Sequence, residues 1–465
     1  MNEAGHRFDP TVLREYDIRG IVGETLSAAD AVAIGRTLAS IAAEGGGKFV
    51  CIGYDGRESS PELEAGVVEG VTAAGLAAVR VGLVATPMLY FASKMLGAAA
   101  AVMVTGSHNP PAYNGFKLVM DNKPFWGGDI RRLGARSADG DWVAGEGAAL
   151  ELDVMAAYVA RLASDYRAER GLKVVWDAGN GSIGPAMEEL VQRIPGEHVL
   201  LNENIDASFP AHHPDPTVAE NLKQLQMAVT GMDYDLGVAF DGDGDRIGAV
   251  DGTGRIVWGD QLLAIYAADL LARVPGATVI ADVKSSQMLF DEIARLGGEP
   301  VMSGTGHSVI KSRMAEIAAP LAGEMSGHMF FADGYYGYDD ALYAALRLVD
   351  IVARGDHSLA ELLDDLPALV NTPEIRFEVP EERKFAIVDE VKARLVETDA
   401  PENLEITDID GVRVNGPDGW WLLRASNTQN VLVVRCESTD EAGLARLKEA
   451  VVDQLKASGV DGAPF

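Results

Sequence analysis

The chain contains only two cysteines, and it has neither a long apolar run nor an apolar signal segment. Cys51 and Cys436 lie in apolar stretches far apart in the sequence, so we expect two buried thiols and no disulfide. No stretch is long enough to cross a bilayer, and the first residues, M-N-E-A-G-H-R-F-D-P, lack the core of a signal peptide. These absences predict a cytoplasmic protein that does not enter a membrane.

Basic residues are also scarce. The chain has 39 lysines and arginines against 70 aspartates and glutamates, which gives a formal net charge of −31. Such a charge repels nucleic acids and anionic lipid surfaces, so neither is an expected partner. An anionic small molecule is compatible with it where a few arginines and lysines converge.

The chain is too long for a single hydrophobic core. At about 150 residues per domain, its length corresponds to three or four domains. A hydrophobic content of 48% and a charged content of 23% are typical of globular proteins and exclude long disordered segments.

Three segments repeat the order strand, polar loop, helix, strand, which is a βαβ unit. In each segment the first strand ends at an aspartate, namely Asp55, Asp177 or Asp282. Polar loops at equivalent strand ends predict three related α/β domains whose loops face one cavity. The expected elements are strands 49–54 and 77–84 with helix 62–74, strands 173–177 and 198–202 with helix 183–193, and strands 278–282 and 299–304 with helix 287–296.

After residue 371 the pattern changes to βαβββα, with a hairpin turn N-G-P-D-G at 415–419. Such a turn between short apolar runs predicts a largely antiparallel sheet. The expected elements are strands 374–379, 411–414, 420–424 and 430–435, helix 384–396 and a final helix. The predicted domains are residues 1–150, 151–255, 256–370 and 371–465.

The stretch V-M-V-T-G-S-H-N-P-P-A-Y-N-G-F-K at 102–117 is the strongest candidate for a reactive centre. Its apolar run stops at Thr105-Gly106, which predicts a buried strand whose end delivers Ser107 and His108 into a crevice. Tandem prolines stiffen the exit, and a second turn at Asn114-Gly115 brings Lys117 back toward the serine. On these residues alone, a surface turn with a capping serine is the favoured interpretation, and a reactive centre needs support from the rest of the chain.

The stretch D-G-D-G-D-R places Asp241, Asp243 and Asp245 in alternation with glycines after an apolar strand. Three converging carboxylates repel one another unless a cation accepts them, and a hard divalent ion such as Mg²⁺ does so. A calcium-binding EF-hand does not fit, because Arg246 and Gly252 stand where that loop needs glycine and glutamate. A solvated acidic turn is the alternative.

Four further clusters carry polar groups of the kind that bind sugars and phosphates. Glu324, Ser326 and His328 in L-A-G-E-M-S-G-H fit polyol recognition. Lys284 and His307 follow two strands and are candidates for proton transfer. Each of these residues is also compatible with an ordinary polar turn.

Two further clusters fit anion binding, and each is also compatible with a solvated strand or turn. They are Arg14, Tyr16, Asp17 and Arg19 near the N-terminus, and Arg424, Ser426, Asn427 and Thr428 in R-A-S-N-T.

Taken in order, T-G-S-H-N-P-P-A-Y-N-G-F-K, D-G-D-G-D-R, G-E-M-S-G-H and R-A-S-N-T closely resemble the α-D-phosphohexomutase superfamily, and within it the bacterial phosphomannomutase/phosphoglucomutase enzymes. The resemblance covers essentially the whole chain. It implies a heart-shaped molecule with one central cleft, three α/β domains and a C-terminal α+β domain similar to the TATA-binding-protein fold. One departure occurs, because Gln429-Asn430 stands where the family has Glu-Pro.

The resemblance implies an intramolecular phosphotransferase that interconverts hexose 1-phosphates and hexose 6-phosphates of mannose and glucose. A phosphorylated Ser107 would carry the phosphoryl group, a hexose 1,6-bisphosphate would turn around in the cleft, and glucose 1,6-bisphosphate or another such bisphosphate would act as activator. Asp241, Asp243 and Asp245 would hold one Mg²⁺ together with the phosphoserine. The implied catalytic residues are Ser107, Arg19, Lys117, Arg246, His307 and His108, and the implied substrate-binding residues are Tyr16, Lys284, Glu324, Ser326, His328, Arg424, Ser426, Asn427 and Thr428.

Other functions remain alternatives at this point. Phosphoglucosamine mutase is the nearest, although by the resemblance Met325 in G-E-M-S-G favours mannose and glucose. A Mg²⁺-dependent sugar phosphatase would use the same groups with water as acceptor, and release of inorganic phosphate would reveal it. A catalytically silent sugar-phosphate-binding protein would carry no phosphate on Ser107. We expect a monomer or weak homodimer.

Overall fold

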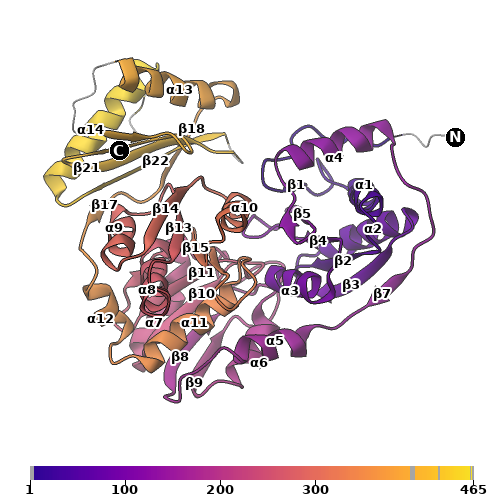
Figure 1. Cartoon of the computed structure of the whole chain (residues 1–465), viewed down its shortest axis with the longest axis horizontal. Helices are drawn as coiled ribbons and strands as arrows, with labels where there is room; N and C mark the ends of the chain where they lie inside the picture. Colours follow the sequence, from indigo (N-terminus) through magenta and orange to yellow (C-terminus); the bar gives the residue numbers. More distant parts are fainter. Residues whose placement is uncertain (1–4, 398–403, 428–429, 461, 463–464) are drawn as a thin grey trace.

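The structure is a computed structural model that describes residues 5–397, 404–427, 430–460, 462 and 465. Four sheets follow one another along the chain, each with its own helices, and the N-terminal and C-terminal parts face each other across the top of the molecule (Figure 1). We call these parts the first to fourth units, in chain order. Cys51 and Cys436 are buried free thiols, as predicted.

The first unit is a mixed sheet in the order β1-β5-β4-β2-β3-β7, with β6 paired to β5. Its central strands β2, β3 and β4 are parallel, whereas β1 and β5 run antiparallel to their neighbours. The strands are β1 Ile18–Ile21, β2 Phe49–Tyr54, β3 Ala77–Leu83, β4 Ala100–Val104, β5 Tyr113–Met120, β6 Lys123–Pro124 and β7 Ala149–Glu151, and the helices are α1 Ala28–Glu44, α2 Ser60–Ala73, α3 Thr86–Leu96 and α4 Gly128–Asp139.

The second unit is a sheet in the order β12-β11-β10-β8-β9, in which β8 pairs in parallel with β9 and β10. Its strands are β8 Leu172–Asp177, β9 Gly196–Leu201, β10 Leu236–Phe240, β11 Ile247–Asp251 and β12 Ile256–Val257, with helices α5 Met155–Ala163, α6 Gly184–Val191 and α7 Lys223–Met232 and the 3₁₀ turn η1 Ala219–Leu222.

The third unit is a sheet in the order β14-β13-β15-β16, in which β13 pairs in parallel with β14 and β15. The parallel pairs β2–β3, β8–β9 and β13–β14 confirm the three predicted βαβ units. Its strands are β13 Thr278–Asp282, β14 Glu299–Ser303, β15 Leu321–Gly323 and β16 Met329–Phe331, with helices α8 Gly259–Arg273, α9 Gln287–Arg295, α10 His307–Ile317, α11 Ala341–Arg354 and α12 Leu359–Asp364.

The fourth unit is a sheet in the order β17-β22-β21-β20-β19, with β18 also paired to β22. All pairs in it are antiparallel, as predicted, but β17 and β19 are short strands that the sequence pattern did not indicate. Its elements are β17 Val370–Asn371, β18 Ile375–Glu378, α13 Glu381–Glu397, β19 Glu405–Thr407, β20 Val412–Gly416, β21 Gly419–Ala425, β22 Val431–Ser438 and α14 Glu441–Ala457.

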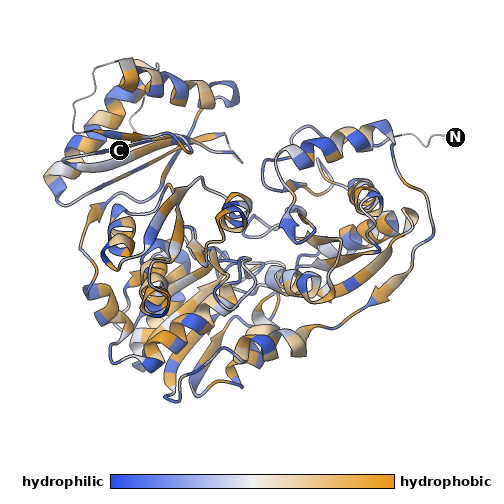
Figure 2. Ribbon diagram, viewed as in Figure 1, coloured by the Kyte–Doolittle hydropathy of each residue, from blue (hydrophilic) through white to orange (hydrophobic). Residues whose placement is uncertain are grey.

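The first three units share one apolar core, whereas the fourth has a core of its own. The shared core includes Met103 of the first unit, Trp176 of the second and Tyr266 of the third. Trp421 and Val451 belong to the separate core of the fourth unit. The strands inside each unit are correspondingly apolar in the hydropathy view (Figure 2). In the described part of the chain, no helix has both the length and the apolar character needed to span a bilayer.

A buried carboxylate joins the second and third units. Asp340 caps α11, accepting a hydrogen bond from the Tyr343 N–H at 2.9 Å, and it accepts others from the hydroxyls of Tyr158 at 2.9 Å and Tyr335 at 2.8 Å. Burial raises the pKa of Asp340 to about 6, against an ordinary value of 3.8, although these hydrogen bonds favour the charged form. The seam between the units therefore contains a titratable group.

The raised pKa of Asp340 predicts a pH-dependent stability. Because the folded-state pKa is raised, protonation of Asp340 adds to the free energy of unfolding. This contribution, at most about 3 kcal/mol, is complete below pH 3.8 and is lost as the pH rises through about 6. Asp340→Asn removes this titration and retains a capping side chain. The variant's free energy of unfolding minus that of the wild type, measured in urea, should therefore increase between pH 4.5 and pH 7. Asp389→Asn, at an exposed site on α13, is the control. A difference that stays flat for Asp340→Asn would contradict the prediction.

Candidate functional site

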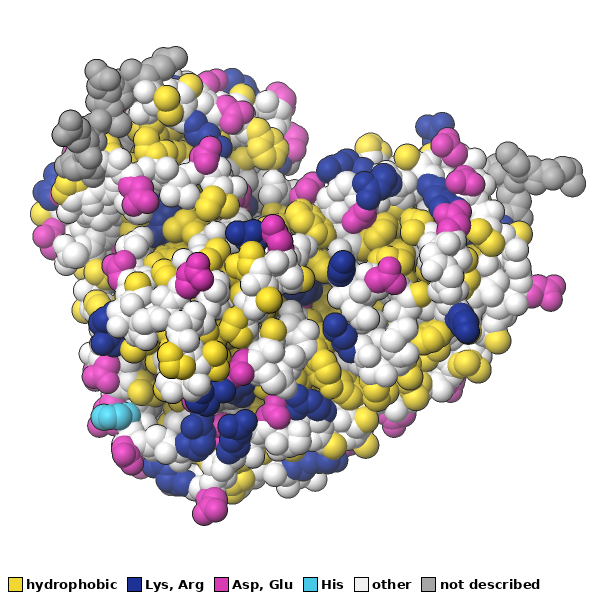
Figure 3. All heavy atoms as spheres, in the orientation of Figure 1, with side chains coloured by type: hydrophobic (Ala, Val, Ile, Leu, Met, Phe, Trp, Pro, Cys, Tyr) yellow, Lys and Arg dark blue, Asp and Glu magenta, His cyan; other side chains and the backbone are white. Residues whose placement is uncertain are grey.

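The predicted functional residues meet in one cleft where the units come together. The outline of the molecule is notched between the first and fourth units (Figure 3). The cleft has a cavity volume of about 170 Å³. The predicted residues that line it are Arg14, Tyr16, Asp17, Arg19, Ser107, His108, Lys117, Arg246, Lys284, His307, Glu324, Ser326, His328, Arg424, Ser426 and Asn427.

Among the described residues, three predicted ones do not line this cavity. Asp241, Asp243 and Asp245 are fully buried, in the loop between β10 and β11. Thr428 and Gln429 lie outside the described residues. The lining also contains Asn109, Thr305, Glu374 and Arg376, which the sequence did not single out.

Ser107 stands at the carboxyl end of β4 in a strained backbone conformation. Its φ of 49° lies in the left-handed region, which costs energy for a residue with a side chain. The Ser107 N–H donates to Thr105 Oγ1 at 2.8 Å, and its Oγ lies 3.1 Å from His108 Nδ1 and 3.1 Å from Asp241 Oδ2. The strain directs the serine hydroxyl toward the acidic loop.

Arg57 holds the serine loop in place, and the sequence did not point to it. This side chain is almost completely buried and lies 3.2 Å from Asp55. The loop therefore wraps around one guanidinium, which fixes the path of the backbone from the serine to Tyr113. The four carbonyl groups that accept its hydrogen bonds, at 2.6 to 3.0 Å, belong to Ser107, Asn109, Pro110 and Tyr113.

Gly106 is required by this packing. A Cβ atom at this position would lie 2.5 Å from Cζ of Arg57, closer than real contacts allow. Asp55, at the end of β2, accepts hydrogen bonds from Thr105 Oγ1 at 2.8 Å and from the Gly106 N–H at 3.2 Å. The predicted aspartate at the strand end thus serves to shape the loop.

The three carboxylates of the acidic loop converge, as predicted, and Lys117 enters among them. Its Nζ lies 2.6 Å from Asp243 Oδ2 and also contacts Asp245 Oδ2. Asp241 Oδ1 accepts hydrogen bonds from three backbone N–H groups of its own loop at 3.0 to 3.1 Å. Oxygen atoms of Asp241, Asp243 and Asp245 all lie within 4.8 Å of one another.

The electrostatics of this cluster fit a divalent cation. Burial raises the pKa of Asp241 well above its usual range, and the Asp245 and Asp243 carboxylates raise it further. Oδ1 of Asp243 is buried without a hydrogen-bond partner, and Oδ1 of Asp245 lacks a well-aligned hydrogen bond but lies 3.3 Å from His328 Nε2. Unpaired carboxylate oxygens at the end of a strand are the ligands that Mg²⁺ takes. Among the described residues, this cluster can supply three protein oxygens to one ion.

Lys117 is held in its charged form. Burial opposes the charge, but the Asp243 and Asp245 carboxylates outweigh it and hold the pKa of Lys117 well above its ordinary value. An ammonium paired with two carboxylates has no lone pair to accept a proton. The geometry therefore suits Lys117 to offsetting negative charge more than to transferring a proton.

Two histidines face each other on the third-unit side of the cleft, with ring centroids 5.6 Å apart. Burial and the ammonium groups of Lys311 and Lys117 hold the pKa of His307 well below its usual value. For His328, burial lowers the pKa, but the Asp245 carboxylate outweighs it and raises the pKa to about 9. One neutral and one charged imidazole thus stand side by side.

The loop between β15 and β16 presents the predicted polyol-binding groups. Glu324 Oε1 accepts a hydrogen bond from the Gly306 N–H at 2.7 Å, and Oε2 lies 3.0 Å from His328 Nδ1. Ser326 Oγ is 3.4 Å from the same nitrogen. The histidine therefore orients both the carboxylate and the hydroxyl that face the cleft.

The fourth unit closes the cleft through polar contacts. Arg424 pairs with Asp410 at 3.0 Å, and Lys284 of the third unit pairs with Glu374 at 2.9 Å. The Tyr16 hydroxyl bridges the units, because it accepts a hydrogen bond from Asn427 Nδ2 at 2.6 Å and donates one to the Thr305 carbonyl at 2.8 Å. The acidic partners were missed because their sequence surroundings resemble those of any surface carboxylate.

Comparison with known proteins assigns each unit to a family of domains. Residues 10–130, 156–254 and 258–370 match phosphoglucomutase/phosphomannomutase alpha/beta/alpha domains I, II and III. Residues 374–454 match the phosphoglucomutase/phosphomannomutase C-terminal domain.

Similar proteins span nearly the same length. The chain is 42% identical over 447 residues to a phosphomannomutase/phosphoglucomutase from Pseudomonas aeruginosa, covering 96% of each chain. It is 42% identical over 440 residues to a phosphoglucomutase from Neisseria gonorrhoeae, covering 94% of this chain and 95% of the relative. A crystal structure of a phosphoglucomutase/phosphomannomutase family protein from Burkholderia thailandensis superposes with a TM-score of 0.92 at 41% identity, over 98% of this chain and 100% of that one. Four matching domains in the same order show that this chain belongs to the phosphoglucomutase/phosphomannomutase family.

Proposed function

We propose that this protein interconverts the 1-phosphates and 6-phosphates of glucose and mannose through a phosphorylated Ser107. The observation that carries the proposal is the placement of Ser107 Oγ 3.1 Å from Asp241 Oδ2, inside a cleft that also holds a sugar-binding loop and a phosphate-binding loop. Its relatives named phosphomannomutase/phosphoglucomutase and phosphoglucomutase support this choice of sugars.

We propose Mg²⁺ as the resident metal, held by Asp241, Asp243 and Asp245 together with the phosphoserine. The unpartnered Oδ1 of Asp243 and the convergence of the three carboxylates support this assignment. When bound, the ion neutralises charge on the phosphoryl group as it transfers.

The transfer itself is a double displacement. A free hydroxyl of the hexose monophosphate forms a bond to phosphorus as the Ser107 Oγ–P bond breaks, and the hydroxyl proton passes to the neutral His307. Ser107 Oγ takes up a proton from solvent as it leaves, and His108, which burial keeps neutral by holding its pKa well below the usual value, can accept a hydrogen bond from the resulting hydroxyl at Nδ1, 3.1 Å away. The reverse reaction then moves the other phosphate of the bisphosphate to Ser107. Arg19, Lys117 and Arg246 stabilise the charge that develops on the transferring group.

The remaining residues hold the sugar while its two ends exchange places. Arg424, Ser426, Asn427 and Thr428 would bind the phosphate that is not reacting, and Glu324 and Ser326 would hold ring hydroxyls. Tyr16, Lys284 and His328 complete the lining. Because the bisphosphate must turn around in the cleft, we propose that glucose 1,6-bisphosphate, which restores phosphoserine, acts as activator. We propose a monomer or weak homodimer as the working state, since the cleft is built within one chain.

The test of this function is a coupled assay with the 1-phosphates of glucose, mannose and glucosamine. Glucose and mannose differ only in the configuration at C2, and in the proposed binding mode Glu324 and Ser326 do not contact the C2 hydroxyl. The turnover of the two sugars should therefore agree within about tenfold, which corresponds to about 1.4 kcal/mol. Ser107→Ala should lose at least about 10³-fold of turnover and all phosphoserine in intact mass. A hundredfold preference for glucosamine 1-phosphate would identify a phosphoglucosamine mutase, and release of inorganic phosphate a phosphatase.

The metal assignment predicts that a chelator abolishes activity and that Mg²⁺ restores it. Asp243→Asn should weaken Mg²⁺ binding and lower turnover at least tenfold, while sugar-phosphate binding, measured by calorimetry, changes less. Asp408→Asn is the matched control, since this carboxylate is exposed on the fourth unit. Full activity of Asp243→Asn in the absence of added divalent metal would refute the assignment.

The role of Arg57 predicts that a conservative change disables the serine loop. Lysine retains the charge but presents one nitrogen where Arg57 bonds four carbonyls, so Arg57→Lys should lower turnover by about 10 to 100-fold. The phosphorylated fraction of Ser107 after incubation with glucose 1,6-bisphosphate should fall in parallel, while Mg²⁺ affinity stays the same. Arg80→Lys, which alters a half-exposed ion pair with Glu64 in the same unit, should behave as wild type. Normal phosphorylation of Arg57→Lys would show that the loop does not need this guanidinium.

A further inference from the structure

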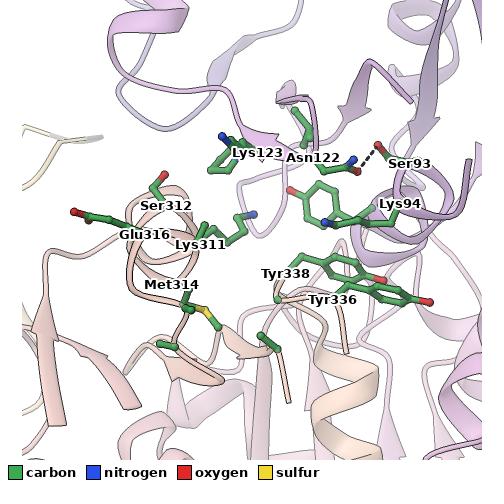
Figure 4. Close-up of a pocket in the computed structure, with 18 of the residues that line it drawn as sticks. Ser93, Lys94, Asn122, Lys123, Lys311, Ser312, Met314, Glu316, Tyr336 and Tyr338 are labelled. Carbon is green, nitrogen blue, oxygen red and sulfur yellow. Dashed lines mark hydrogen bonds between the residues drawn. The ribbon is translucent and has the colours of Figure 1, made fainter. Parts of the chain in front are cut away.

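A second pocket lies between the first and third units, apart from the cleft. Its volume is about 720 Å³, which is within the range of about 300 to 1,000 Å³ typical of ligand sites. One wall is α3 with the β5–β6 turn, and the other is α10 with the segment 332–338. Figure 4 shows the side chains of Lys94 and Lys311 extending from these two walls toward the space between them. Sites between domains are common places for ligands.

Three lysines line this pocket. They are Lys94 on α3, Lys123 on β6 and Lys311 on α10. Glu316 is the one acidic residue in the lining, so the pocket carries a local positive charge in a chain whose net charge is −31. Within the described part of the chain, Lys94 and Lys123 form no ion pair with a carboxylate, whereas Lys311 pairs with Asp339 at 2.8 Å. This arrangement favours a ligand with at least two negative charges.

The rest of the lining suits a flat ring. Tyr336 and Tyr338 stack with an interplanar angle of 12°, and Tyr336 is about one-third exposed. The floor consists of Met314, prolines and alanines. A sugar ring would need carboxylates to accept its hydroxyl hydrogens, as Glu324 offers in the cleft. A nucleobase instead stacks on tyrosine and covers apolar surface.

We propose that this pocket binds a nucleoside diphosphate, with the base against Tyr336 and the diphosphate between Lys94, Lys123 and Lys311. The turn that leads to Lys123 is tight, with positive φ at both Asp121 and Asn122, of 50° and 58°. Ser93 on α3, whose hydroxyl has only a long contact of 3.5 Å with Asn122 Oδ1, adds a group that can donate to a phosphate oxygen. No residue of the proposed catalytic or sugar-binding set belongs to this lining.

A chain of contacts through Lys311 connects the pocket to the cleft. Lys311 contacts Asp339 and also lies 4.6 Å from the centre of the Tyr90 ring. Asp339 is buried, with its second oxygen 3.5 Å from His307 Nδ1. A bound diphosphate would attract the ammonium group of Lys311 and so reduce the positive charge that offsets the Asp339 carboxylate. The negative charge next to His307 would then increase. Resting on the proposed role of His307, we infer that the bound nucleotide lowers mutase turnover.

Calorimetry with ADP tests the site independently of activity. ADP should bind, whereas adenosine and pyrophosphate, which each lack one half of the ligand, should bind at least tenfold more weakly. Lys94→Ala/Lys123→Ala should weaken ADP binding at least tenfold, and Tyr336→Ala should weaken ADP more than pyrophosphate. Lys223→Ala, an exposed lysine on α7, and Arg424→Ala, in the cleft, should leave ADP affinity unchanged.

The outcomes separate this inference from the proposed function. Nucleotide binding that Arg424→Ala weakens while Lys94→Ala/Lys123→Ala does not would overturn the site, whatever the mutase assay shows. UDP and GDP in place of ADP determine whether one base is preferred, and a lack of binding by all three would also overturn it. In the coupled assay, saturating ADP should lower wild-type turnover at least twofold and should not affect Lys94→Ala/Lys123→Ala at the same concentration. Unchanged wild-type turnover at saturation would overturn the connection through Lys311.

Discussion

The cleft depends on how three buried carboxylates are held together. Asp241, Asp243 and Asp245 are all fully buried, so their mutual repulsion is not screened by water. Lys117 from β5 offsets two of them, and Thr86 at the start of α3 donates a hydrogen bond to Asp243 at 2.5 Å. Both partners come from the first unit, whereas the aspartates belong to the second. The compensation of charge therefore also fixes the distance between Ser107 and its acidic loop.

Compensation of buried charges by ion pairs also explains how a strongly acidic protein can bind an anion. The cations that line the cleft are themselves paired, Lys284 with Glu374 and Arg424 with Asp410. Each pair is largely buried, so its side chains are oriented before a ligand arrives. Preorganised donors lose little conformational entropy on binding. The net charge of −31 is thus compatible with a phosphate-binding cleft, because the fixed arrangement of a few cations matters more there than the total charge.

Much of the fold was predictable because its signals are local. The apolar run before Ser107 and the aspartates that end β2, β8 and β13 identified the strand ends correctly, since hydrophobic patterning reports burial directly. The short strands β17 and β19 carry too few residues to show a pattern. Arg57 was not predicted, because a polar loop between strand and helix does not reveal which distant carbonyls its guanidinium reaches.

The partners of the cleft residues were hidden for the same reason. Asp339 directly precedes the residue that caps α11, whereas its partner Lys311 lies on α10, 28 residues earlier in the chain. The sequence does not show that these two side chains meet. Asp410 pairs with Arg424 inside the fourth unit, and Glu374 pairs with Lys284 of the third unit. Nothing in the sequence neighbourhood of either carboxylate distinguishes it. The motif residues themselves were found by resemblance, whereas their electrostatic environment required the structure.

The separate core of the fourth unit bears on how the cleft works. A cavity of about 170 Å³ is smaller than a typical ligand site, although the proposed bisphosphate must turn around within it. The contact between the fourth and first units includes the polar bond between Asn427 and Tyr16, which water or a phosphate can replace. The apolar core joins the first three units, so Ser107 and the carboxylates stay in register whatever the position of the fourth unit. The fourth unit meets the third through a small apolar cluster that includes Trp420 and through buried hydrogen bonds from Arg413. Turning the fourth unit away from the first would therefore break fewer buried contacts than separating it from the third.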